Sequence, residues 1–140
     1  MIHFRVTDTD FWFCSKELQL KMFEKQIREL MNQTQQMIKI RKQILQSTNE
    51  FIEIISSIAV THPKKIPNNK ELLIQTSLLA EAYNLQIQAD TKVFNLAKDY
   101  ARMMGAVKNA QNDRKAVLMQ TTKLQKKEEI IRDDSEEVNE

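Results

Sequence analysis

Glycine and proline are almost absent from this chain of 140 residues, which contains only Gly105, Pro63 and Pro67. A compact domain of this length reverses direction several times, and reversals are where these two residue types concentrate. The chain therefore has sequence signals for about one reversal. Both prolines lie in the run from residue 62 to residue 69, where the missing amide donor and the ring of proline end a helix. We expect the turn there.

The residues before this turn predict one long helix, from about residue 10 to residue 61, preceded by a lead-in at 1–9. Asp8 or Asp10 can cap its start. Apolar side chains recur at alternating steps of three and four, an average of 3.5 that is typical of a coiled-coil seam. They are Leu20, Phe23, Ile27, Leu30, Met37, Ile44, Phe51, Ile55 and Ile58. A second column lies beside this one, at Met31, Ile38, Leu45, Ile52 and Ala59. Two adjacent columns predict contact with at least two neighbouring helices.

A second helical pattern follows the turn, from about residue 70 to residue 132. Its seam positions include Val93, Leu96, Tyr100, Met103 and Val107. The closing stretch, 133–140, is acidic with little to bury, and we expect it to be frayed. Helices of these lengths would measure about 75 and 95 Å. The sequence therefore predicts an all-α fold of two very long antiparallel amphipathic helices, and their wide apolar stripes predict a coiled-coil dimer.

Composition and charge exclude several classes of function. A formal net charge of +2 does not favour binding to nucleic acid. No apolar run resembles a membrane span, and the lone Cys14 fits a reducing compartment, so we expect a cytoplasmic or peripheral protein. One glycine cannot form a phosphate-binding loop, no spacing of ligands suggests a metal, and no catalytic cluster stands out. We expect no cofactor and no enzymatic activity.

Several short strings resemble retromer-type sorting nexins, which carry BAR domains. Asp10-Phe11-Trp12-Phe13-Cys14-Ser15-Lys16 is similar to the D-x-W-F-x-x-K entry into their first BAR helix. Arg41-Lys42, followed by Thr48 and Phe51, resembles R-K-x-L-x-x-x-T-x-x-F, with Ile44 in place of leucine. The segment from Asp99 to Arg114 is similar to D-Y-x-R-L-x-x-V-x-x-A-x-x-x-R. Leu79-Ala80-Glu81, Gln88-Ala89-Asp90 and Leu124-Gln125-Lys126-Lys127 also match in order.

The resemblance implies a dimeric, membrane-curvature-sensing or membrane-tubulating scaffold on endosomes, with a homodimeric or heterodimeric sorting-nexin partner and a retromer-type complex. It also implies binding to anionic, phosphoinositide-containing membranes through basic residues near the arm tip: Lys115, Lys123, Lys126, Lys127 and Arg132. Family members have a PX domain upstream and a third long helix, and this sequence resembles neither, so we expect a fragment of the family architecture. The alternative is a coiled-coil adaptor or tether that dimerises without binding lipid.

One set of residues is assigned to the seams that join helices, either within one hairpin or between two copies. It consists of Phe23, Ile27, Leu30, Met37, Ile44, Phe51, Ile55, Val93, Leu96, Tyr100, Met103 and Val107. Arg41 and Arg114 also fall on these lines, where a polar residue can fix register, although such a side chain can equally extend to solvent. The aromatic residues at 11–13 either pack at the dimer interface or act as a membrane wedge. Gly105 would allow a close helix approach or a bend.

Overall fold

The computed structural model describes residues 10–64 and 69–138, and these form two α-helices and no strand. Helix α1 spans Phe11–Thr61 (51 residues) and helix α2 spans Asn69–Glu137 (69 residues). The all-α class, predicted from the scarcity of glycine and proline and from the apolar spacing, is confirmed. The lead-in at 1–9, which includes Asp8, residues 65–68 of the proline-containing turn and the last two residues lie outside the described residues.

Helix α2 continues five residues beyond the expected end at Arg132, so the acidic residues at 133–137 are helical. They contain neither glycine nor proline, and each turn there can form the ordinary backbone hydrogen bonds of a helix. Every described residue from 123 to 138 is exposed. Helical structure at this end therefore does not depend on burial against the rest of the described chain.

Asp10 caps helix α1. Its Oδ1 accepts hydrogen bonds from the backbone N–H groups of Trp12 (3.0 Å) and Phe13 (3.4 Å), and its own carbonyl accepts one from Cys14 (3.1 Å). These bonds satisfy donors that the first turn of any helix leaves without an intrahelical partner. Helix α1 therefore begins at the first residue of the aromatic triplet.

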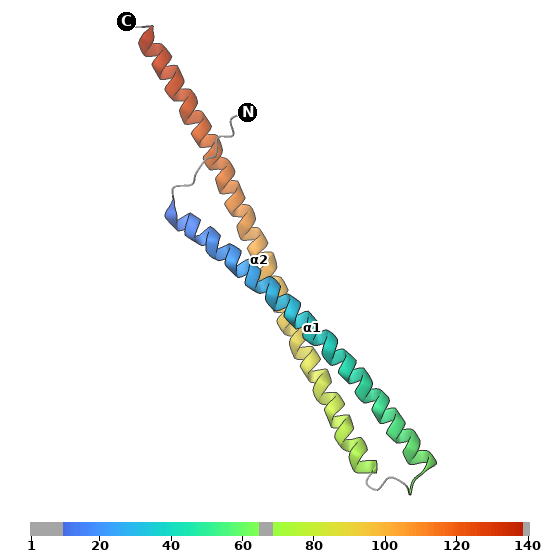
Figure 1. Ribbon diagram of the computed structural model, residues 1–140. Coiled ribbons are helices and arrows are strands. Elements are labelled where there is room, and N and C mark those ends of the chain that lie inside the picture. The colour runs from blue at the N-terminus through green and yellow to red at the C-terminus, as the bar shows by residue number, and fades with distance from the viewer. Residues whose placement is uncertain (1–9, 65–68, 139–140) are drawn as a thin grey trace. The chain divides into compact units, whose positions relative to one another are not determined.

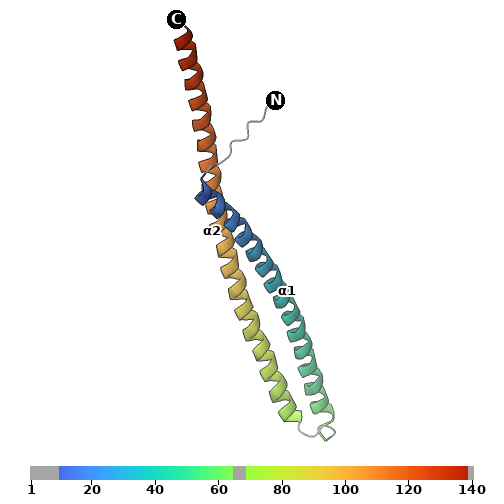
Figure 2. The same cartoon turned by 60° about the vertical axis from the view of Figure 1, so that its left-hand side comes forward.

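The chain divides into two compact units. The hairpin unit is Gln26–Tyr100, and the terminal unit combines Met1–Lys25 with Ala101–Glu140. In the hairpin unit the end of α1 and the start of α2 lie side by side and run in opposite directions, as Figures 1 and 2 both show. In the terminal unit the start of α1 contacts α2 through the side chains of Glu17 and Lys115.

Buried and half-buried residues of the hairpin unit recur every three or four positions on both helices. We call this set the hairpin seam: Ile27, Met31, Thr34, Ile38, Arg41, Leu45, Thr48, Ile52, Ile55 and Ala59 on α1, and Leu73, Thr76, Ala80, Tyr83, Ile87, Asp90, Phe94 and Ala97 on α2. It combines the predicted second column of α1 with Ile27 and Ile55 of the first, and with Thr34, Arg41 and Thr48, which lie at seven-residue intervals between them. The small side chains at several of these positions allow the two backbones to approach closely.

Candidate dimerisation and membrane-binding surfaces

A row of large apolar side chains is exposed along α1, beside the residues that face α2. Its members are spaced by seven residues: Phe23, Leu30, Met37, Ile44 and Phe51, between 39% and 48% exposed. The sequence assigned them to a seam, together with Ile27 and Ile55. The structure buries Ile27 and Ile55 and leaves the residues of the row exposed, so the row is not part of the hairpin seam.

Helix α2 carries exposed apolar residues on the line that the sequence assigned to its seam. Val93, Leu96, Tyr100, Met103 and Val107 are all exposed, between 43% and 62%. The residues that α2 buries or half-buries are shifted by one position, at Phe94, Ala97, Ala101 and Met104. Periodicity located the apolar stripes of α2 without showing which column faces α1. As an interface between two copies, the exposed line remains a prediction.

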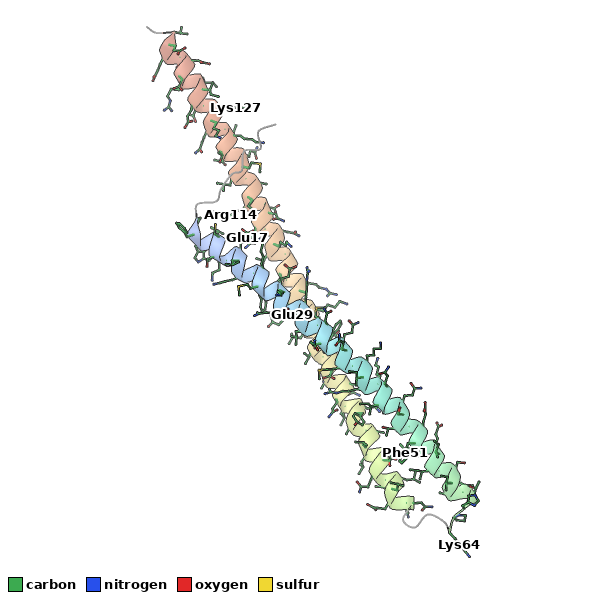
Figure 3. All side chains as sticks on the ribbon, in the orientation of Figure 1. Glu17, Glu29, Phe51, Lys64, Arg114 and Lys127 are labelled. Carbon is green, nitrogen blue, oxygen red and sulfur yellow. The ribbon has the colours of Figure 1, made fainter. Side chains whose placement is uncertain are left out.

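An open groove lies between the two helices of the hairpin unit, with a volume of about 450 Å³. Phe51, labelled in Figure 3, lines it from α1. Most of the lining is apolar or small and comes from both helices: Ile40, Gln43, Ile44, Ser47, Thr48, Phe51, Thr76 and Leu79. Ile44 and Phe51 of the exposed α1 row thus share this groove with Leu79 of α2, which is 49% exposed.

The five basic residues predicted to touch lipid do not form one cluster. Lys123, Lys126 and Lys127 are three or four residues apart and therefore share one face of α2. Lys127 lies on the part of α2 near its C-terminal end (Figure 3). Arg132 follows Lys123 by two and a half turns, which places it on the opposite side of the helix. Lys115 pairs with Glu17 at 2.6 Å. A shared basic face is therefore formed by three of the five.

Arg114 belongs to a contact at the start of α1. Its guanidinium carbon lies 3.7 Å from the centre of the Phe13 ring, and its Nη2 lies 3.9 Å from Oδ2 of Asp10. Arg114 therefore stacks on one motif residue while pairing with the helix cap, which joins the first and third of the matched strings. Figure 3 shows Arg114 and Glu17 in the same region of the chain. We name Arg114, Phe13 and Asp10 the start clasp.

The aromatic triplet has two environments. Phe13 is half-buried beneath Arg114 and meets Trp12 edge-on, with ring centres 4.8 Å apart. Phe11 and Trp12 are 90% and 61% exposed. Packing within the chain thus accounts for Phe13. A contact with a second copy or with lipid remains a prediction for the other two.

Sequence reasoning missed the ion pairs across the helices. Arg41 pairs with Asp90 inside the hairpin seam. In the terminal unit Glu24 and Lys108 lie 3.9 Å apart, one heptad from Glu17 and Lys115 on both helices. The signal was present, since Glu17 and Glu24 extend the apolar column of Met31 and Ile38 with acidic residues. Aligning the two heptad patterns in opposite directions could have revealed them.

Within residues 10–64 and 69–138, no group of three or more His, Cys, Asp or Glu side chains is placed to hold a metal ion. In the same residues, neither helix contains a stretch that is apolar enough to cross a membrane.

A comparison with protein-family models matched residues 1–139 to the family described as Vps5 C terminal like. Searches of curated proteins and of solved structures gave no significant match. The family match covers both helices and all of the strings that resemble sorting nexins. The chain therefore belongs to the Vps5 C-terminal-like family, the sorting-nexin type of BAR domain.

Proposed function

We propose that this chain is a dimeric scaffold that senses or generates membrane curvature in endosomal protein sorting, and that it has no catalytic activity. The observation that carries the proposal is the exposed row on α1 together with the exposed apolar line on α2. Rows of large apolar side chains exposed to solvent often mark an interaction site. A heptad spacing is the pattern that another helix packs against.

The occupant that we propose for this surface is a second copy of the chain or a related sorting nexin. Membership of the Vps5 C-terminal-like family supports it, as does the groove beside Phe51, which offers a helical partner residues from two helices at once. Packing of the partner would remove the α1 row from water. Each fully buried leucine, isoleucine or phenylalanine contributes about 1.5–3 kcal/mol.

Dimerisation is tested by placing a charge in the row. Ile44→Glu in the 140-residue chain is expected to convert a dimer into a monomer, because a carboxylate would be buried without a counter-charge. The matched control is Asn49→Glu, which adds the same charge at an exposed position of α1 outside the row and the seam. Light-scattering mass across a dilution series distinguishes the two. Equal masses for wild type and Ile44→Glu would contradict this interface.

Membrane binding is proposed through the shared basic face of Lys123, Lys126 and Lys127. Each lysine near an anionic surface contributes about 1 kcal/mol, and a dimer presents two such faces. The face has acidic neighbours, since Glu128 and Glu129 follow it directly. We therefore expect binding that depends on several weak contacts and falls as ionic strength rises. Retromer-type partners and an endosomal location are proposed from the family resemblance.

The lipid proposal is tested by sedimentation with liposomes containing anionic phosphoinositide. Reversal of Lys126 and Lys127 to Glu is expected to weaken binding at least tenfold, while Lys42→Glu with Lys92→Glu, the same change in charge on the hairpin unit, leaves most of it. The dimer mass of each variant is measured first. A wild-type dimer that never sediments with these liposomes would favour the adaptor or tether, which dimerises without lipid.

A further inference from the structure

The hairpin seam contains one pair of oppositely charged residues among otherwise apolar or small uncharged side chains. Arg41 of α1 and Asp90 of α2 form an ion pair within it, and their side chains are only 25% and 15% exposed. No other charged residue belongs to the seam as defined for residues 26–64 and 69–100. The pair lies where each helix faces the other and replaces an apolar layer.

The apolar layers alone do not determine how far one helix is displaced along the other. In antiparallel helices, moving seven residues back on α1 corresponds to moving seven forward on α2. Counted from Arg41 and Asp90, Ile38 and Leu45 lie level with Phe94 and Ile87. A displacement of one heptad would put Ile38 level with Ile87, or Leu45 level with Phe94. Apolar residues would still face apolar residues at these positions, so these layers do not exclude either displacement.

The charged layer separates these registers. After a displacement of one heptad, Arg41 would lie level with Tyr83 or Ala97, and Asp90 with Thr34 or Thr48. None of these residues carries a compensating charge. A largely buried charge without its partner is strongly unfavourable, while an intact pair is close to neutral relative to apolar residues of similar size. The pair therefore disfavours the alternatives more than it stabilises the native arrangement.

Val60 and Thr61, at the end of α1, are exposed, so unwinding them costs little burial and adds chain for a displaced register. The register also decides which outward residues become neighbours. In the observed alignment Phe51 lies level with Ala80 and lines one groove with Leu79, whereas a displacement of one heptad would place it level with Leu73 or Ile87.

We propose that the Arg41–Asp90 pair is the register-selecting contact of the hairpin, and that it thereby positions the α1 row beside the exposed apolar residues of α2. It acts as a positioning pair, through the alignment of the helices. The selection takes place within one chain and holds whether or not that chain dimerises or binds lipid.

Spin labels test the register directly. Cysteines replace the exposed Ser57 and Gln88 in the 140-residue chain, and Cys14, which is exposed, is changed to Ser to prevent a third label. Labelled chain is diluted with unlabelled chain so that distances between copies do not contribute. A displacement of one heptad moves the labels by about 10 Å along the helix axis. Pulsed electron–electron double resonance then measures the distribution of distances between the two spin labels.

Wild type and the control Lys42→Leu with Lys92→Leu, which adds two leucines outside the seam, are expected to give one distance. Arg41→Leu with Asp90→Leu is expected to give at least two distances about 10 Å apart while remaining helical. A single native distance in this variant would overturn the proposal.

Arg41→Asp alone puts two carboxylates in one layer and is expected to lose the native distance. The exchanged pair, Arg41→Asp with Asp90→Arg, is expected to restore it. Retention of the native distance in Arg41→Asp, or its absence in the exchanged pair, would equally overturn the proposal.

Discussion

The hairpin unit and the terminal unit use the same heptad column of α1 for different chemistry. In the hairpin unit the column holds Met31, Ile38, Leu45 and Ile52, whereas in the terminal unit it holds Glu17 and Glu24. Helix α2 changes in step, from Ile87 and Phe94 to Lys108 and Lys115. The hairpin unit joins its helices mainly by removing apolar surface from water, whereas the terminal unit adds partly exposed ion pairs to a smaller buried set that includes Met104.

This difference predicts unequal contributions to stability. Full burial of an isoleucine, leucine or methionine side chain contributes about 1.5–3 kcal/mol. Of the buried apolar residues, Ile27, Ile55, Ala80 and Ala97 belong to the hairpin unit and Met104 to the terminal unit. An exposed ion pair contributes about 0–1 kcal/mol and weakens with salt. Most of the stabilisation between the helices therefore comes from the hairpin unit. The contacts of the terminal unit hold the start of α1 locally.

The largest effect is expected from Ile55→Ala in the hairpin unit. Ile55 is 4% exposed, so its truncation leaves a cavity and should lower the free energy of unfolding by about 2–4 kcal/mol. Urea unfolding followed by circular dichroism, at one fixed protein concentration, measures the change. Val60→Ala on the same helix is the control, because Val60 is 82% exposed. Similar losses in both variants would contradict the assigned seam.

A smaller and local effect is expected from Arg114→Ala in the terminal unit. The substitution removes the stacking on Phe13 and the ion pair with Asp10, together about 1 kcal/mol at a partly exposed site. Amide hydrogen exchange should become about fivefold faster in the first two turns of α1. Residues 34–59 are expected to keep their protection. Unchanged amide exchange near Phe13 in Arg114→Ala would show that the start clasp does not hold this end of α1. Exchange in Lys16→Ala, a substitution near the start of α1 that leaves the clasp residues in place, is measured for comparison.

Gly105→Ala in the terminal unit is expected to stabilise the chain by about 0.8 kcal/mol, because alanine restricts the unfolded chain and favours the helix. A Cβ at this position would meet no atom within 4 Å, so no close approach within the chain requires glycine. The midpoint of thermal unfolding should rise. A lower midpoint at concentrations where the chain is dimeric, but not where it is monomeric, would locate the close approach between copies.

The smallest effect is expected from Glu17→Gln. It removes the ion pairs with Lys115 (2.6 Å) and Lys21 (3.8 Å) at a side chain that is 25% exposed. We expect a loss of at most about 0.5 kcal/mol at low salt, decreasing toward zero at 1 M salt as the charges are screened. Unfolding of wild type and variant at two ionic strengths checks this. A loss that does not change with salt would point to packing in place of charge.

The sequence predicted the two helices because missing glycine and proline are a strong constraint on long stretches of chain. It also located the apolar columns of α1. It did not identify the column of α2 that packs on α1, since Val93 and Phe94 occupy adjacent columns that are both apolar. Periodicity gives the width of a stripe, while the division of that stripe between partners depends on three-dimensional packing. Lys115 was placed with the basic set for a similar reason, because its partner Glu17 is 98 residues away along the chain.

The separations along the chain of these paired residues also bear on the order in which they form. Arg41 and Asp90 are 49 positions apart, and Glu17 and Lys115 are 98 apart. Doubling the length of a flexible loop adds about 0.6 kcal/mol to the entropy cost of closing it. That cost is as large as a surface ion pair contributes, so Glu17 and Lys115 gain little by meeting before the hairpin seam has formed. Pairing that begins near the connection and proceeds toward the chain ends avoids this cost, and during synthesis the start of α1 must wait for Lys115 to emerge.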